Sequence, residues 1–104
     1  MQEISTQAEF MQIIDNHPRV FVEFIATWCN PCATIDPFVF SMAEMYPNLK
    51  FIRIDVDENL DTPSYAKIFL MPTFIGYLNG KEIIRTEGAE TDCVNKVIQK
   101  LAAA

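Results

Sequence analysis

Mostly apolar runs of six or seven residues mark the strands that this chain is expected to form. Residues 20–26 (VFVEFIA) and 51–56 (FIRIDV) are rich in β-branched and aromatic residues, which is typical of strands covered on both faces. Residues 73–78 form a third run that ends at Asn79-Gly80, a common hairpin turn, and residues 81–86 follow as its antiparallel partner.

Apolar residues at helical spacing fill the segments between these runs. Thr6 to Glu9 fits a capping box, and Phe10, Ile13 and Ile14 continue it as a first helix. A longer helix is predicted from about Asn30 to Tyr46. Its expected apolar positions are Ile35, Phe38, Val39, Met42 and Met45.

Two shorter signals predict the remaining helices. Asp61 and Thr62 precede Pro63 as a cap followed by a proline at the first helical position, and a short helix through Ala66 to Phe69 is expected. Thr91 is expected to cap a last amphipathic helix. The apolar face of this helix carries Val94, Val97, Ile98 and Leu101.

The order of these elements predicts a single α/β domain over residues 1–104. Parallel strands that are joined by helices and closed by a hairpin give a mixed sheet between layers of helices. One more short strand is expected near Glu3-Ile4.

Composition and charge narrow the classes of function. A net charge of -6 and a pI of about 4.6 disfavour binding to nucleic acid or to anionic membranes. No apolar run approaches the roughly 20 residues of a membrane helix, and residues 1–4 do not resemble a signal peptide. Three cysteines, an odd number, argue against a fully bridged secreted protein. We therefore expect a cytoplasmic protein, and the sequence leaves open an organelle reached with a transit peptide that has been removed.

Cys29 and Cys32 give the most specific chemical signal. They lie three residues apart, directly after the strand predicted at 20–26 and at the start of the long helix, the setting of a CxxC redox motif. A sulfur at a helix N-terminus meets unpaired N–H groups and the positive end of the helix dipole, which favour the reactive thiolate. We expect Cys29 to attack a disulfide and Cys32 to resolve the mixed disulfide, with Pro31 stiffening the loop between them.

Two other interpretations of the cysteine pair stay open at this point. A structural zinc site needs four ligands, and only Cys93 and His17 remain, without ligand-like spacing; we therefore expect no metal site. The pair could also be inert. Cys93 itself is expected to be a small, partly buried residue of the last helix, with a regulatory or dimerising thiol as the alternative.

Glu23 and Arg53 are lone charges within the two most apolar strands. Burial would raise the pKa of Glu23 and suit it to exchange a proton with Cys32; the alternatives are a structural ion pair or a tip that reaches solvent. Because the two strands are expected to be neighbours, Glu23 and Arg53 should pair. A permanently charged arginine should hold Glu23 ionised more firmly than a lysine would.

Pro72, in the segment Met71-Pro72-Thr73-Phe74, enters a predicted strand. A proline there indicates a turn, a sheet edge or a cis peptide bond. A cis bond would expose the preceding backbone for pairing with an extended peptide, whereas an ordinary trans proline would only start the strand.

Taken together, these motifs resemble the thioredoxin family over nearly the whole chain. The segments that carry the resemblance are Trp28-Cys29-Asn30-Pro31-Cys32, Asp36-Pro37, Asp55-Val56-Asp57, Met71-Pro72-Thr73-Phe74, Asn79-Gly80 and Gly88-Ala89. The resemblance implies a thioredoxin fold, with a central mixed sheet of four to five strands flanked by about four helices.

The resemblance also implies a function and a site. The chain would reduce protein disulfides through Cys29 and Cys32, with Pro72 cis beside them and no bound cofactor other than this redox-active disulfide. A thioredoxin reductase drawing on NADPH would recharge it, and disulfide-containing proteins such as peroxiredoxins would be substrates. The residues expected to line a shallow apolar groove for these substrates are Trp28, Asn30, Pro31, Met71, Thr73, Gly88 and Ala89.

Four positions depart from the pattern that the family usually shows. Asn30 stands in place of a glycine, and the residue between the cysteines tunes the redox poise. Its amide could also hydrogen-bond a sulfur or cap the helix. Glu23 stands in place of an aspartate, Arg53 in place of a frequent lysine, and Ala33 in place of a basic residue.

Two other functions fit the same residues. The cysteines could run as an oxidase or isomerase in an oxidising compartment, which a strongly oxidising equilibrium with glutathione would indicate. Alternatively, the chain could be a binding or scaffold subunit whose cysteines are dispensable.

Overall fold

A mixed sheet of five strands, with four helices around it, accounts for the whole chain in the computed structural model, which describes residues 1–104. In chain order the elements are β1 (Gln2–Glu3), α1 (Gln7–Asn16), β2 (Arg19–Ile25), α2 (Asn30–Met45), β3 (Lys50–Asp55), α3 (Asp61–Ala66), β4 (Thr73–Leu78), β5 (Lys81–Glu87) and α4 (Thr91–Ala103). Their order across the sheet is β1-β3-β2-β4-β5. The expected fold class and the short N-terminal strand are confirmed.

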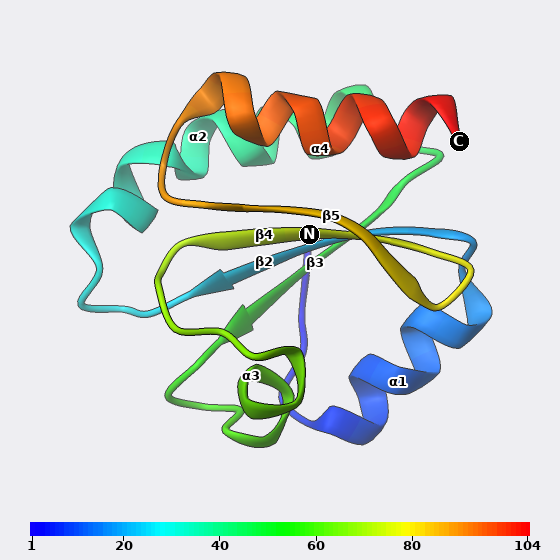
Figure 1. Cartoon of the computed structure of the whole chain (residues 1–104). Helices are drawn as coiled ribbons and strands as arrows, with labels where there is room; N and C mark the ends of the chain where they lie inside the picture. Colours follow the sequence, from blue (N-terminus) through cyan, green and yellow to red (C-terminus); the bar gives the residue numbers. More distant parts are fainter.

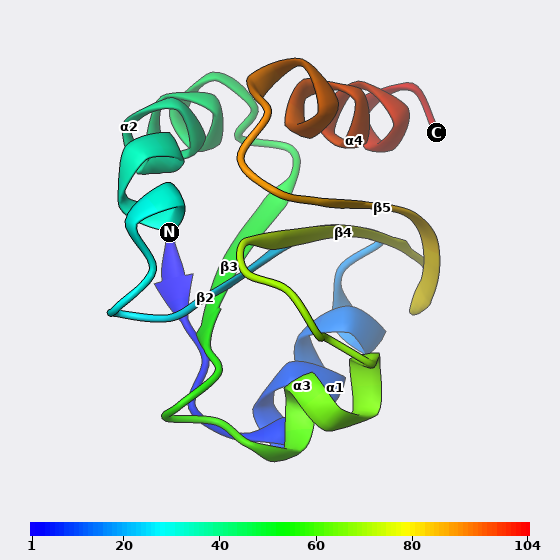
Figure 2. The same ribbon diagram turned by 60° about the vertical axis from the view of Figure 1, so that its left-hand side comes forward.

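The helices form two layers, one on each face of the sheet. Figures 1 and 2 show α2 and α4 over one face and α1 and α3 over the other. Alternation along the central strand explains this arrangement, because successive side chains of a strand point to opposite faces. Val20, Val22 and Phe24 belong to the core under α1, whereas Phe21 belongs to the core under α2 and α4. Both faces of β2 are therefore covered, as its apolar pattern predicts.

Strand directions bring distant segments to one edge of the sheet. β2 is parallel to β3 and antiparallel to β4, which is antiparallel to β5. Thr73, the first residue of β4, pairs with Phe24 near the end of β2 and with Glu87 at the end of β5. The segments just before Thr73 and just after Glu87 therefore lie beside the end of β2, where the cysteine motif begins.

The predicted limits of α3 are wrong at both ends. Leu60 is the N-cap, and Asp61 is already helical and makes no capping hydrogen bond. Asn59 takes that role, because its Oδ1 accepts the Thr62 N–H at 3.2 Å. The helix ends at Ala66 rather than Phe69 because Lys67 adopts a left-handed conformation with a φ of 59°, which closes a helix C-terminus.

Two further predictions about helices are corrected. Thr91 is the first residue of α4 instead of its cap, since Glu90 takes the N-cap position without a side-chain hydrogen bond. Met45 does not pack in the core and is 65% exposed. It lies about 120° around the helix axis from the buried Val39, so the turn of the helix carries it off the apolar stripe. The capping box of α1 is confirmed, with Thr6 Oγ1 accepting the Glu9 N–H at 3.1 Å.

No helix combines the length and the apolar character needed to cross a bilayer.

Gly76 allows α4 to lie close to the sheet, which gives a first prediction. A Cβ at this position would lie 3.0 Å from Ile84 Cγ2 and 3.0 Å from Leu101 Cγ. We expect Gly76→Ala to lower the free energy of unfolding by about 1–3 kcal/mol, because these core side chains would have to shift. Urea denaturation measures the loss. Ser41→Ala, at an exposed position of α2, is the control and should change stability little; equal stability of the two variants would contradict the close packing.

Candidate active site

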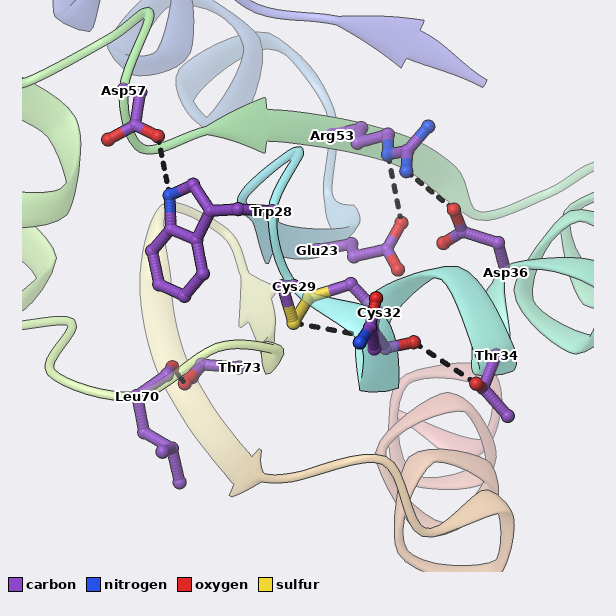
Figure 3. The surroundings of a disulfide bond; sticks show 11 residues. Glu23, Trp28, Cys29, Cys32, Thr34, Asp36, Arg53, Asp57, Leu70 and Thr73 are labelled. Atoms are coloured by element: carbon purple, nitrogen blue, oxygen red, sulfur yellow. Dashed lines mark hydrogen bonds and ion pairs between the residues drawn. A yellow bond between two sulfur atoms is a disulfide. The ribbon is translucent and has the colours of Figure 1, made fainter.

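The two predicted cysteines are joined at the start of α2. Cys29 occupies the N-cap position and Cys32 lies in the first turn, and the two form a disulfide with their Cα atoms 5.3 Å apart. Figure 3 shows the hydrogen bond in which the Cys32 N–H donates to Cys29 Sγ at 3.2 Å. A sulfur therefore caps this helix. The Asn30 side chain, considered from the sequence for that role, is exposed and makes no hydrogen bond within the chain.

Apolar side chains enclose this disulfide on the protein side. Ile25 and Ala26 from the end of β2 form one cluster with the cysteines, and Val56 and Met71 pack against that cluster. Cys29 is 6% exposed and Cys32 is 2% exposed. Solvent and large partners therefore meet only a small part of the cysteine pair.

Trp28 presents an aromatic surface next to the pair. Its side chain is 66% exposed, and its Nε1 donates to Asp57 Oδ2 at 2.9 Å. This hydrogen bond ties the indole to the loop after β3. Asp57 was not singled out as a site residue, since it belonged to a general acidic run after a predicted strand; only the folded chain brings it to the tryptophan.

The segment around Pro72 completes this edge of the sheet. The Met71–Pro72 peptide bond is cis, as the family resemblance implies. The Gly88 N–H donates to the Pro72 carbonyl at 2.8 Å, and Gly88 has a φ of 97°, in the left-handed region that favours glycine. Neither the N–H nor the carbonyl of Met71 makes a hydrogen bond within the chain, so both are free to pair with another backbone.

The residues expected to line the groove differ in how far they are exposed. Asn30 and Pro31 are exposed beside Cys29, and Gly88 and Ala89 are half-buried beside Pro72. Thr73 is buried, and its hydroxyl donates to the Leu70 carbonyl. The Thr73 side chain therefore supports the loop before β4 and is not presented to a partner.

Glu23, on β2, lies on the sheet face that α2 covers, and this helix encloses it. It is fully buried, and it is the register partner of Arg53 on β3. Arg53 Nε lies 3.5 Å from Glu23 Oε1, so the predicted ion pair is confirmed. The same guanidinium makes a much closer contact through its Nη2, which lies 2.6 Å from Asp36 Oδ2 on α2.

The expectation that burial raises the pKa of Glu23 is confirmed, and the ion pair with Arg53 does not keep Glu23 ionised. The pKa of Glu23 is raised to about 8: burial is the largest cause, the negative charge of Asp36 and a hydrogen bond with its carboxyl group add to it, and Arg53 only partly opposes them. Asp36 is the site residue that the sequence analysis missed as a functional group. A signal was available, because Asp36 follows Cys32 by four residues and so lies on the same face of the helix.

The other candidate groups stay apart from this site. Cys93 is a free, half-buried thiol on α4, and His17 is exposed after α1. No group of three or more His, Cys, Asp or Glu side chains is arranged to hold a metal ion.

A disulfide at a strand-to-helix junction, next to a cis proline and above a buried carboxyl group, defines the class of thiol-disulfide oxidoreductases. Residues 2–100 match the family model described as thioredoxin. Thioredoxin 1 of Plasmodium falciparum is 38% identical over 100 residues, which cover 96% of this chain and 96% of that protein.

Solved structures agree with this match. A structure of Plasmodium falciparum thioredoxin superposes with a TM-score of 0.93 at 36% identity, over 96% of this chain and 98% of the other. A yeast structure that concerns thiol resolution in a mitochondrial 1-Cys peroxiredoxin superposes with a TM-score of 0.93 at 29% identity, over 97% of this chain and 95% of the other.

The chain therefore belongs to the thioredoxin family. It is a thioredoxin-type thiol-disulfide oxidoreductase, a protein-disulfide reductase whose redox centre is the Cys29–Cys32 disulfide.

The raised pKa of Glu23 predicts how stability depends on pH. The folded-state pKa of about 8 exceeds the ordinary value of 4.5, so the unfolded chain ionises first. The contribution of Glu23 to stability is thus fully present below pH 4.5 and is lost as pH rises towards 8. Within this window the loss approaches about 1.4 kcal/mol per pH unit.

We therefore expect Glu23→Gln to be more stable than the parent protein at pH 8, by a margin that is much smaller at pH 5. Urea denaturation at a series of pH values measures the difference. Glu44→Gln, which removes a carboxylate from an exposed position of α2, should follow the parent at every pH. A constant difference between Glu23→Gln and the parent would show that Glu23 ionises normally in the folded state.

Proposed function

We propose that Cys29 is the nucleophile and Cys32 the resolving cysteine when this protein reduces disulfides of other proteins. The observation that carries the proposal is the hydrogen bond from the Cys32 N–H to Cys29 Sγ, which places the Cys29 sulfur at the N-terminus of α2. There the unpaired N–H groups and the helix dipole stabilise a thiolate. Cys32 is the more deeply buried of the two and follows one turn later.

The reaction balances in two exchange steps. The Cys29 thiolate attacks one sulfur of the partner's disulfide, and a mixed disulfide forms while the second partner sulfur leaves as a thiolate and takes up a proton. Cys32 then gives its proton to Glu23 in its ionised form, which is in equilibrium with the protonated form because the pKa of Glu23 is about 8. Cys32 attacks Cys29 Sγ, which releases the first partner sulfur as a thiolate that is protonated in turn. The partner gains two electrons and two protons, and Cys29 and Cys32 form the disulfide.

Substrate proteins are proposed to dock across the edge of the sheet that carries the cysteines. The free N–H and carbonyl of Met71 support pairing with an extended segment of the partner, a form of strand addition. The exposed Trp28 ring supplies apolar contact on one side. Asn30 and Pro31 border Cys29, and Gly88 and Ala89 border Pro72 on the other side.

The partners follow from the family and from one structural neighbour. A thioredoxin reductase linked to NADPH would return Cys29 and Cys32 to the dithiol. Peroxiredoxins are proposed as substrates because the similar yeast structure concerns thiol resolution in a mitochondrial peroxiredoxin. We propose that the chain works as one domain over residues 1–104. The free Cys93 suits a reducing compartment such as the cytoplasm, with mitochondria as the alternative.

Replacing the cysteines one at a time tests their proposed roles. Cys29→Ser should reduce insulin disulfides no faster than a blank reaction, because no nucleophile remains. Cys32→Ser should complete only the first step and accumulate a mixed disulfide with the partner, which mass spectrometry detects. Cys93→Ser is the control and should keep full activity. Substantial insulin reduction by Cys29→Ser would refute its assignment as nucleophile.

The WCNPC motif, with Asn30 where the family usually has glycine, is proposed to keep a reducing poise. The Asn30 side chain makes no hydrogen bond to either sulfur, so Asn30→Gly removes no hydrogen bond of the disulfide. We expect this substitution to change the equilibrium constant with glutathione less than tenfold, or about 30 mV. Larger changes, or a strongly oxidising parent, would favour an oxidase or isomerase.

A further inference from the structure

Arg53 stands between two carboxyl groups and binds them unequally. Its Nη2 hydrogen-bonds Asp36 Oδ2 at 2.6 Å, whereas its Nε lies 3.5 Å from Glu23 Oε1 and makes no hydrogen bond. The guanidinium also lies over the ring of Phe40, with Cζ 5.4 Å from the centroid. Asp36 and Phe40 are one turn apart on α2, so this helix holds Arg53 by two contacts.

No donor of the chain pairs with the Glu23 carboxyl group, and its hydrogen-bonding contact is with the carboxyl group of Asp36, which requires a proton on one of the two. Both of its carboxyl oxygens are buried and meet no donor of the chain, and the same is true of Asp36 Oδ1. Burying an unpaired carboxylate costs several kcal/mol, whereas a carboxyl group that keeps its proton avoids most of this cost. In Figure 3 the Glu23 carboxyl lies on the side of α2 that carries Cys32 and Asp36. The arrangement favours a protonated Glu23 next to an ionised Asp36.

We propose that Asp36 is a positioning residue for disulfide exchange, which binds Arg53 more closely than Glu23 does and so leaves the buried Glu23 carboxyl group able to exchange a proton with Cys32. The inference rests on the proposed role of Glu23 as proton acceptor of Cys32. Asp36 touches neither sulfur and acts only through Arg53 and Glu23.

The charged groups that face Glu23 come from two elements. α2 contributes Asp36, and β3 contributes Arg53, while the neighbouring residue on β4 is the uncharged Phe74. After burial, Asp36 is the largest cause of the raised pKa of Glu23, and Arg53 opposes it. Removing the charge of Asp36 should therefore lower the pKa of Glu23 in two ways. A like charge disappears, and Arg53 becomes free to bind Glu23.

Two measurements on Asp36→Asn test the inference. The first follows the Glu23 carboxyl carbon by NMR through a pH titration of the oxidised protein. The second is the pH profile of disulfide reduction under single-turnover conditions. We expect the NMR midpoint of Glu23 to fall by about 1 pH unit, as for a carboxyl group that exchanges a like charge for an arginine partner, and the midpoint of the rate profile to fall with it.

Three further variants complete the design. Asp36→Glu retains the charge and should keep both midpoints close to those of the parent. Glu44→Gln removes a carboxylate from an exposed position of the same helix and should leave both unchanged. Asp36→Ala replaces Asp36→Asn if that variant does not fold, because alanine favours the helix and leaves no amide unpaired.

The possible outcomes test the inference about Asp36 and the proposed role of Glu23 as proton acceptor separately. If the Glu23 midpoint stays where it is in both Asp36→Asn and Asp36→Ala, the inference about Asp36 is overturned. If the NMR midpoint falls but the rate profile does not move, Asp36 sets the protonation of Glu23, but Glu23 is removed from the proposed mechanism and the role of Asp36 in disulfide exchange is overturned with it. If both midpoints fall together, both proposals are supported.

Discussion

The antiparallel pairing of β4 with β2 is the constraint on which the site depends. Thr73 is held between Phe24 and Glu87, and this register delivers the Met71–Pro72 peptide and Gly88 to the end of β2. A shift by one residue would move these groups by about 3.3 Å and turn each β4 side chain to the opposite face. The cysteine motif alone is therefore not the site, because the surface beside the disulfide comes from three separate segments.

The helix that follows the motif adds a second, electrostatic contribution. α2 starts at the edge of the sheet, so the Cys29 sulfur meets its unpaired N–H groups. The same helix also carries Asp36, which binds Arg53 on β3, and Arg53 in turn lies beside Glu23 on β2. One helix thus favours a thiolate at its end and a protonated carboxyl group beneath it. Both effects require a chain that excludes water on the protein side, which the clusters around the disulfide and under α2 provide.

The predictions that succeeded rest on strong local patterns, and those that failed depended on the exact course of the chain. Apolar runs and the Asn79-Gly80 turn gave the four main strands correctly, since few other arrangements bury them. The limits of α3 were missed because Asn59 caps the helix and Lys67 ends it. The left-handed backbone conformation of Lys67 is not one that a lysine in the sequence predicts. Met45 was assigned to the core because helical spacing was counted without the gradual rotation of the apolar stripe.

The sequence by itself determined the fold class, the cysteine pair, its helical setting and the proximity of Glu23 to Arg53, because all of these follow from spacing along single elements and from neighbouring strands. Only the tertiary structure decided which carboxylate binds Arg53 closely and so which protonation state Glu23 prefers. The physical reason is that desolvation and competition among three charges depend on distances of a few ångströms between different elements. No pattern in a single segment encodes such distances.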